Sequence, residues 1–131
     1  MSNLVYTFDY LHNYDPAKAV IELAMSLPGR LQPKVSTAML VDSGADKTMI
    51  AIDILQSINA KPIDHIRVRS LFGASRSTEL YVVDLHLGVH HIRAVEVAAL
   101  PAGEENIMGR DVLNQLVVTL HGLAGVTEVA G

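Results

Sequence analysis

The stretch that decides the fold is AMLVDSGAD, residues 38–46. An apolar run leads into Asp42, and Ser43 and Gly44 follow directly, so a strand is expected to end there in a sharp turn. Gly44 allows a close approach of the backbone, and Ser43 adds a hydroxyl. A carboxylate fixed at the end of a strand is preorganised, as a general acid or base must be. Asp42 is therefore the candidate catalytic residue, and the competing interpretation of the triplet is a simple polar turn.

A second informative stretch is NIMGRDVL, residues 106–113. An apolar pair ends at Gly109, and residues 110–116 have the pattern of a short helical segment. Met39, Met49 and Met108 flank these two stretches and are most simply core side chains.

Elsewhere, apolar segments bounded by turn residues predict short strands at 19–25, 35–41, 65–71, 79–87, 92–100, 116–120 and 125–129. Turn residues at 72–77 make the third and fourth of these the arms of a β-hairpin. A short helix is expected around residues 48–58, where Ile50, Ile54, Leu55 and Ile58 have suitable spacing. Residues 1–17 look irregular. Many short strands with few helices favour a barrel or sandwich over a doubly wound sheet.

From about Val20 to His121, these features resemble the retropepsin-like aspartic protease family, in a cellular or bacterial member. That family has an apolar-apolar-D-[ST]-G-A motif, a β-hairpin flap, and later an apolar-apolar-Gly before a short helix. The resemblance implies a mostly-β fold: a closed acid-protease-like β-barrel, one retropepsin-type lobe, with one or two short helices. A single domain over residues 1–131 is expected, with 1–18 as an N-terminal extension outside the match.

The resemblance also implies roles for individual residues. Asp42 would be catalytic, and the active-site loop would be supported by Ser43, Gly44, Ala45, Asp46 and Arg110. Substrate would be bound by Gly44, Asp46, Leu71, Phe72, Gly73, Ala74 and Ile107. Asp46 and Arg110 are expected to form a carboxylate–guanidinium pair, and Gly73 is the expected hinge of the flap.

The implied chemistry requires two neighbouring carboxylates that share a proton. The chain contains a single D-[ST]-G triplet, so a homodimer would have to supply the second one. The predicted function is therefore a homodimeric aspartic endopeptidase acting on peptide or protein substrates. Two alternatives remain: a non-proteolytic retropepsin-like domain for dimerisation or peptide binding, and an unrelated β-barrel that binds a small ligand.

Composition argues against several other classes. The net charge is −4 with 18% charged residues, so no basic face for nucleic acid is expected. There is no cysteine, no apolar run long enough to span a membrane, and no signal-peptide pattern in the first 15 residues, which favours a cytoplasmic protein. His86, His90 and His91 lack an acidic ligand placed with them, and the glycines match no phosphate-binding pattern. We therefore expect no metal or cofactor. Ser43 also lacks the G-x-S-x-G elbow of a serine nucleophile.

Overall fold

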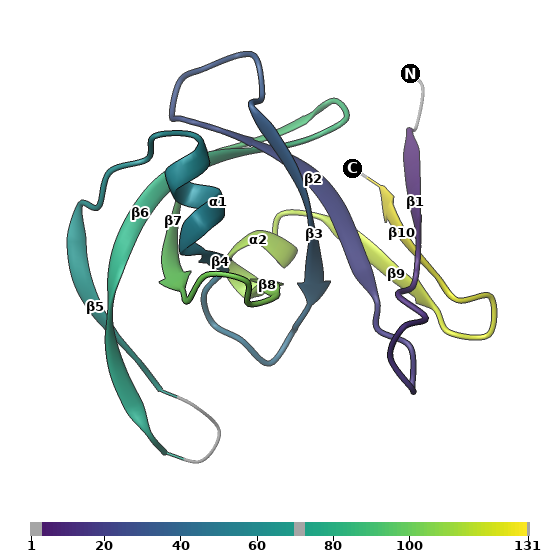
Figure 1. Ribbon diagram of the computed structural model, residues 1–131. Helices are drawn as coiled ribbons and strands as arrows, with labels where there is room; N and C mark the ends of the chain where they lie inside the picture. Colours follow the sequence, from purple (N-terminus) through teal and green to yellow (C-terminus); the bar gives the residue numbers. More distant parts are fainter. Residues whose placement is uncertain (1–3, 70–72, 131) are drawn as a thin grey trace.

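The computed structural model describes residues 4–69 and 73–130. Ten strands and two short helices are found there (Figure 1). In chain order they are β1 (Val5–Asp9), β2 (Val20–Ser26), β3 (Val35–Val41), β4 (Met49–Ala51), α1 (Ile52–Ser57), β5 (Asp64–Arg69), β6 (Ser75–Leu87), β7 (His90–Leu100), β8 (Asn106–Met108), α2 (Arg110–Leu113), β9 (Val117–His121) and β10 (Val126–Ala130).

Six of the strands form a closed barrel. Their order is β2-β3-β8-β4-β7-β6, and a direct pairing of β2 with β6 closes the ring. The interior holds the hydrophobic core, which includes the fully buried Ile21, Met39 and Val97. Apolar side chains from opposite walls fill a six-stranded barrel, as expected for a barrel this narrow. The predicted fold class, a mostly-β closed barrel with two short helices, is confirmed.

A second sheet of order β1-β10-β9 lies beside the barrel (Figure 1). Its strand β1 corrects the sequence interpretation of residues 1–17 as irregular. Val5 to Asp9 pairs along its whole length with β10, from Val5 opposite Ala130 to Asp9 opposite Val126. The half-buried rings of Tyr6 and Phe8 pack against the core. This strand exists because a partner near the other end of the chain satisfies its backbone, which no local pattern could indicate.

The boundaries of the helices also differ from the prediction. Residues 49–51 form strand β4, so Ile50 is a strand residue and α1 begins at Ile52. Leu55 is the buried residue of α1 and anchors the helix on the barrel. The second helix ends at Leu113 rather than at residue 116. The turns after it are closed by single hydrogen bonds, such as that from the Leu116 N–H to the Leu113 carbonyl at 3.1 Å.

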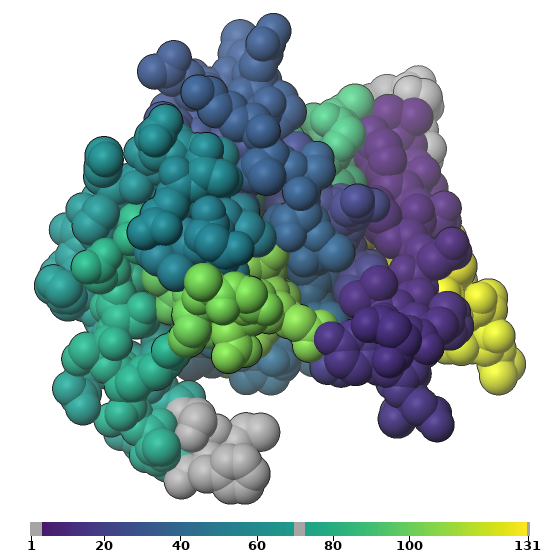
Figure 2. All heavy atoms as spheres, viewed as in Figure 1, coloured from purple at the N-terminus to yellow at the C-terminus, as the bar shows by residue number. Residues whose placement is uncertain are grey.

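The described parts of the two predicted hairpin arms pair with each other, but residues 75–77 are not part of the tip as expected. Residues 75–77 belong to β6 and pair with β5, with Ser75 opposite Arg69 and Ser77 opposite Arg67. Strand β6 reaches β7 only from Leu80 onward. Residues 65–69 and 75–79 therefore form a two-stranded ribbon, which projects from the body of the molecule (Figure 2).

A buried carboxylate reinforces the wall where the barrel closes. Asp84 is 1% exposed and accepts the backbone N–H groups of Gly29 (3.0 Å) and Ala94 (2.7 Å). Its Oδ2 also lies 3.0 Å from Nε2 of His91. Although burial alone would raise it, these hydrogen bonds hold the pKa of Asp84 below its ordinary value. The carboxylate thus ties the turn after β2 to strands β6 and β7.

His86 stands next to this carboxylate, on the three-residue pairing of β2 with β6. Its Nε2 and the hydroxyl of the fully buried Ser26 are hydrogen-bonded at 2.8 Å. Its ring stacks on that of His91, with centroids 4.3 Å apart. Burial, and then the charge of His91, lower the pKa of His86. Among the described residues, no group of histidines and acids is arranged to hold a metal ion.

This arrangement predicts a loss of stability in mild acid. Because the pKa of His86 is lower in the folded chain than its ordinary 6.5, the unfolded chain takes up the proton first as the pH falls. The free energy of unfolding should therefore fall as the pH drops from about 7 to below about 6. The His86→Gln chain should lack this pH-dependent loss. When the pH is lowered, its thermal midpoint should therefore fall by a few degrees less than that of the native chain.

The measurement is thermal unfolding at pH 7.5 and pH 5.5. The exposed His65 provides a control, because His65→Gln removes an imidazole outside the cluster. Identical pH dependence in the native chain and in His86→Gln would contradict the prediction.

Candidate active site

Two parallel strands deliver the two motifs to the same place. β3 pairs in parallel with β8, with Leu40 opposite Ile107 and Val41 opposite Met108. Both strands therefore end at the same edge, where Asp42 follows one and Gly109 the other. The Asp42 N–H continues the ladder by donating to the Met108 carbonyl at 3.1 Å. The backbone of the candidate catalytic residue is thus fixed by the barrel itself.

The turn that follows orients the carboxylate of Asp42. The Gly44 N–H donates to Asp42 Oδ1 at 3.0 Å, and the Ala45 N–H donates to the Asp42 carbonyl at 3.2 Å. A Cβ at position 44 would lie 3.3 Å from the same Oδ1, so the turn closes tightly around the carboxylate. Among the described residues, Oδ2 of Asp42 has no hydrogen-bond partner. One carboxylate oxygen is held, and the other is available.

Arg110 connects this turn to the second motif. Its Nη1 donates to the Ser43 carbonyl at 2.8 Å, and its Nη2 forms an ion pair with Asp46. Its backbone N–H donates to the Ala45 carbonyl at 2.9 Å. The side chain of Asp46 is 87% exposed, so the ion pair on its own adds little stability. Arg110 fixes the shape of the Asp42 loop, because this one residue contacts Ser43, Ala45 and Asp46.

A cavity of about 280 Å³ opens beside the carboxylate. It is lined by Lys18, Ala19, Leu40, Val41, Asp42 and Ile107. Lys18 donates to Glu105 at 3.2 Å and lies 3.8 Å above the ring of Tyr14. Hydrogen bonding from Tyr14, and then from Lys18, lowers the pKa of Glu105. Lys18 was not among the predicted site residues, because it ends the N-terminal extension, residues 1–18, that lies outside the resemblance.

Comparison with known protein families assigns the chain to one of them. A family model described as "gag-polyprotein putative aspartyl protease" matches residues 28–115, which is more than half of the chain and includes both motifs. The chain belongs to the retropepsin-like aspartic protease family. The family prediction made from the two motifs is therefore confirmed.

Solved structures show the same fold. A retropepsin-like aspartic protease from Rickettsia conorii superposes with a TM-score of 0.66 at 11% identity, covering 99% of this chain and 94% of that one. The EIAV protease, complexed with the inhibitor HBY-793, gives a TM-score of 0.58 at 18% identity, covering 75% of this chain and 86% of that one. No curated protein matches the chain. At identities this low, the likeness to these structures establishes the fold of this retropepsin-like chain alone.

Thr48 and Asp111 form a second brace that the sequence interpretation did not identify. Asp111 Oδ1 accepts both the Thr48 hydroxyl (2.7 Å) and the Thr48 N–H (3.1 Å). The same hydroxyl oxygen accepts the Gly109 N–H at 3.1 Å. A Cβ on Gly109 would lie 2.6 Å from the backbone carbon of Lys47, so only glycine fits where the two motifs meet. Asp111 is followed by Val112 and not by Ser-Gly, so the triplet pattern assigns it no role.

The predicted substrate-binding residues that the structure describes lie in three places. Ile107 lines the cavity beside Asp42, while Gly44 and Asp46 line a different one, of about 380 Å³, which faces the ribbon. Gly73 and Ala74 are exposed just before β6, and Gly73 has a φ of 81°, a conformation that suits glycine. Leu71 and Phe72 lie outside the described residues.

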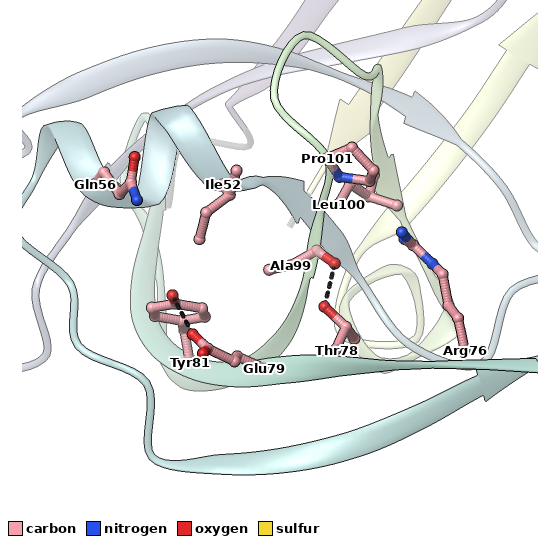
Figure 3. A pocket seen from close by; sticks show the side chains of 9 residues that line it. All are labelled: Ile52, Gln56, Arg76, Thr78, Glu79, Tyr81, Ala99, Leu100 and Pro101. Carbon is pink, nitrogen blue, oxygen red and sulfur yellow. Dashed lines mark hydrogen bonds between the residues drawn. The ribbon is translucent and has the colours of Figure 1, made fainter.

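The largest of these cavities, about 420 Å³, lies elsewhere in the retropepsin-like chain (Figure 3). It is formed by α1, β6 and the end of β7, and none of its lining residues belongs to the Asp42 loop. Several of its polar groups are paired with each other: Thr78 donates to the Ala99 carbonyl (2.7 Å) and Tyr81 to Glu79 (2.9 Å). Burial, with the Glu79 hydrogen bond, raises the pKa of Tyr81 to about 12. This tyrosine stays protonated at any ordinary pH and offers no base.

Within residues 4–69 and 73–130, no helix is long and apolar enough to cross a membrane.

Proposed function

We propose that the protein is an aspartic endopeptidase that acts as a homodimer, with one Asp42 from each chain. The observation that carries this proposal is the state of Asp42. One oxygen of its carboxylate is held by the Gly44 N–H, while the cavity beside it contains no other acid among its lining residues. A single chain therefore presents half of a two-carboxylate site.

The chemistry follows from bringing two such halves together. Two carboxylates at hydrogen-bonding distance cannot both ionise cheaply, so the pair holds one shared proton. The ionised partner takes a proton from a water, and that water attacks the peptide carbonyl carbon. The protonated partner gives its proton to the carbonyl oxygen. Collapse of the resulting diol breaks the C–N bond: the leaving nitrogen takes the proton that the first carboxylate removed from water, and a diol hydroxyl returns its proton to the second carboxylate.

The neighbouring residues support this reaction by position. Ser43, Gly44 and Ala45 form the turn that aims the carboxylate, and Arg110 with Asp46 keeps that turn in shape. Such preorganisation matters because a displacement of about 1 Å can reduce a rate by about a hundred-fold. We further infer that a peptide substrate lies along Gly44 and Ile107, beneath the hairpin.

A homodimeric site makes the rate depend on chain concentration. If each site needs two chains, activity per chain should fall as the concentration falls through the dimer dissociation constant. Well below that constant, the total rate should rise with about the square of the concentration. Peptide cleavage measured over a dilution series, with sedimentation velocity on the same samples, tests this. An activity per chain that stays constant where only monomer sediments would contradict the proposal.

A further inference from the structure

The cavity that faces the ribbon carries an unusual set of charges. It is lined by Gly44, Ala45, Asp46, Lys47, Met49, Ile66, Arg67, Val68 and Arg69, and its volume is about 380 Å³. Three of the ten basic residues of a chain with net charge −4 thus surround one cavity. Gly44 and Ala45 also belong to the turn around the Asp42 carboxylate, so the cavity adjoins the proposed catalytic site.

These cations have no counter-ion in the part of the chain that the structure describes. Asp46 is the acid in the lining, and Arg110 already pairs with it from outside the cavity. Lys47, Arg67 and Arg69 form no ion pair with any described residue. The half-buried Lys47 is partly removed from water, which makes an added negative charge more favourable there than at an open surface.

The ribbon holds one of the three cations in a defined position. Arg67 donates from Nη2 to the Ser75 hydroxyl (3.2 Å) and from Nη1 to the Ser77 hydroxyl (3.3 Å). Both serines lie on the facing arm of the hairpin, so the guanidinium is fixed across the ribbon. Its neighbours Ile66 and Val68 are half-buried on the opposite face of β5 and give the cavity an apolar wall, while Arg67 and Arg69 are exposed at its rim.

We propose that this cavity selects substrates with an acidic side chain, glutamate or aspartate, close to the scissile bond. The inference rests on the proposed proteolytic function and names a substrate class for it. The carboxylate would lie near Lys47, its methylene groups against Ile66 and Val68, and Arg67 and Arg69 would add a favourable potential from the ribbon. A neutral side chain of the same size would leave the cations without a partner.

The test uses a synthetic peptide library of mixed sequence with two separate measurements. The native chain is incubated with the library, and the residues around new cleavage points are read by mass spectrometry. In parallel, immobilised Asp42→Asn chain is used to retain uncleaved peptides, which are then sequenced. In both measurements, acidic residues should be enriched about three- to ten-fold at one position relative to Gln and Asn. The enrichment should shrink as salt is raised.

Charge reversal supplies the specificity control. Lys47→Glu should remove the acidic preference and favour Lys or Arg at that position. Lys34→Glu makes the same charge change at an exposed residue outside the cavity lining and should leave the preference intact.

The outcomes separate this inference from the proposed function. Cleavage without acidic enrichment would overturn the inference and leave the endopeptidase proposal standing. Retention of acidic peptides without cleavage would support the inference and count against proteolysis. Equal loss of preference in Lys47→Glu and Lys34→Glu, or no peptide either cleaved or retained, would overturn the inference.

Discussion

Replacing Asp42 by Asn is expected to lower peptide cleavage by at least about a thousand-fold. The amide keeps the shape of the side chain and can still accept the Gly44 N–H. It cannot ionise, so a dimer of two such chains can neither take a proton from water nor share one with its partner. The stability of the fold should change little, because the second carboxylate oxygen makes no hydrogen bond with a described residue. Initial rates of peptide cleavage and the thermal midpoint are the two measurements.

A matched control removes the same charge elsewhere. Asp9 is exposed on β1, and Asp9→Asn should retain full activity.

Mixing native and Asp42→Asn chains provides a second test, because a dimer of one native and one variant chain holds a single catalytic carboxylate. With a nine-fold excess of the variant, the activity of a fixed amount of native chain should fall to about one tenth.

Two results would contradict the proposal. Substantial cleavage by Asp42→Asn would exclude Asp42 as the catalytic residue. An unchanged rate in the mixing experiment, with heterodimers demonstrated, would show that the site does not combine two chains. A native chain that binds peptides across a broad pH range without cutting them would instead favour the peptide-binding alternative.

Substituting Gly109 by Ala is expected to have the largest effect on the fold. The new Cβ would lie 2.6 Å from the carbonyl carbon and 2.8 Å from the carbonyl oxygen of Lys47, and 3.0 Å from the carbonyl oxygen of Ala45. These are backbone atoms, so no side-chain rotation relieves the clash. We expect a loss of about 3 kcal/mol or more in the free energy of unfolding. Because Ala45 belongs to the turn around Asp42, any molecules that fold should also cleave poorly.

Gly122 provides the matched control for this substitution. It lies in the turn between β9 and β10, and a Cβ there would meet nothing within 4 Å. Gly122→Ala should unfold at the same denaturant concentration as the native chain and cleave at the same rate. Urea unfolding of both variants is the measurement. A Gly109→Ala chain as stable and active as Gly122→Ala would show that the contact between the two motifs is not tight.

The sequence was sufficient for the elements that carry a local signal. Strand β3 is an apolar run that ends in Asp-Ser-Gly, and both of its ends were predicted. The three-residue strand β8 was not among the predicted strands, although the apolar pair before Gly109 was singled out. The proximity of Arg110 and Asp46 followed from the resemblance, and the structure places the two side chains in contact. The catalytic role of Asp42 stays a prediction.

Features that depend on distant partners could not be predicted. Strand β1 forms only because β10 lies beside it. Residues 75–77 are polar and look like a turn, yet they extend β6 because β5 pairs with them in a ribbon that is largely exposed on both faces. Residues 75–79, Ser-Arg-Ser-Thr-Glu, are polar throughout, so this arm has no alternation of apolar and polar residues to read. Thr48 and Asp111 are 63 positions apart, and neither has a distinctive neighbour in the sequence.

The ribbon of β5 and the first five residues of β6 should have a lower free energy of local opening than the barrel. Its arms form backbone pairings only with each other, apart from the side-chain bond of Thr78 to the Ala99 carbonyl, whereas every strand of the barrel pairs with a strand on both sides. An isolated two-stranded ribbon is marginally stable in water. It can therefore fray and re-form many times while the barrel keeps its amide protons protected. The Asp42 carboxylate is attached to the barrel, which opens slowly and cooperatively. The arms that would cover a substrate belong to the ribbon, which opens locally and often.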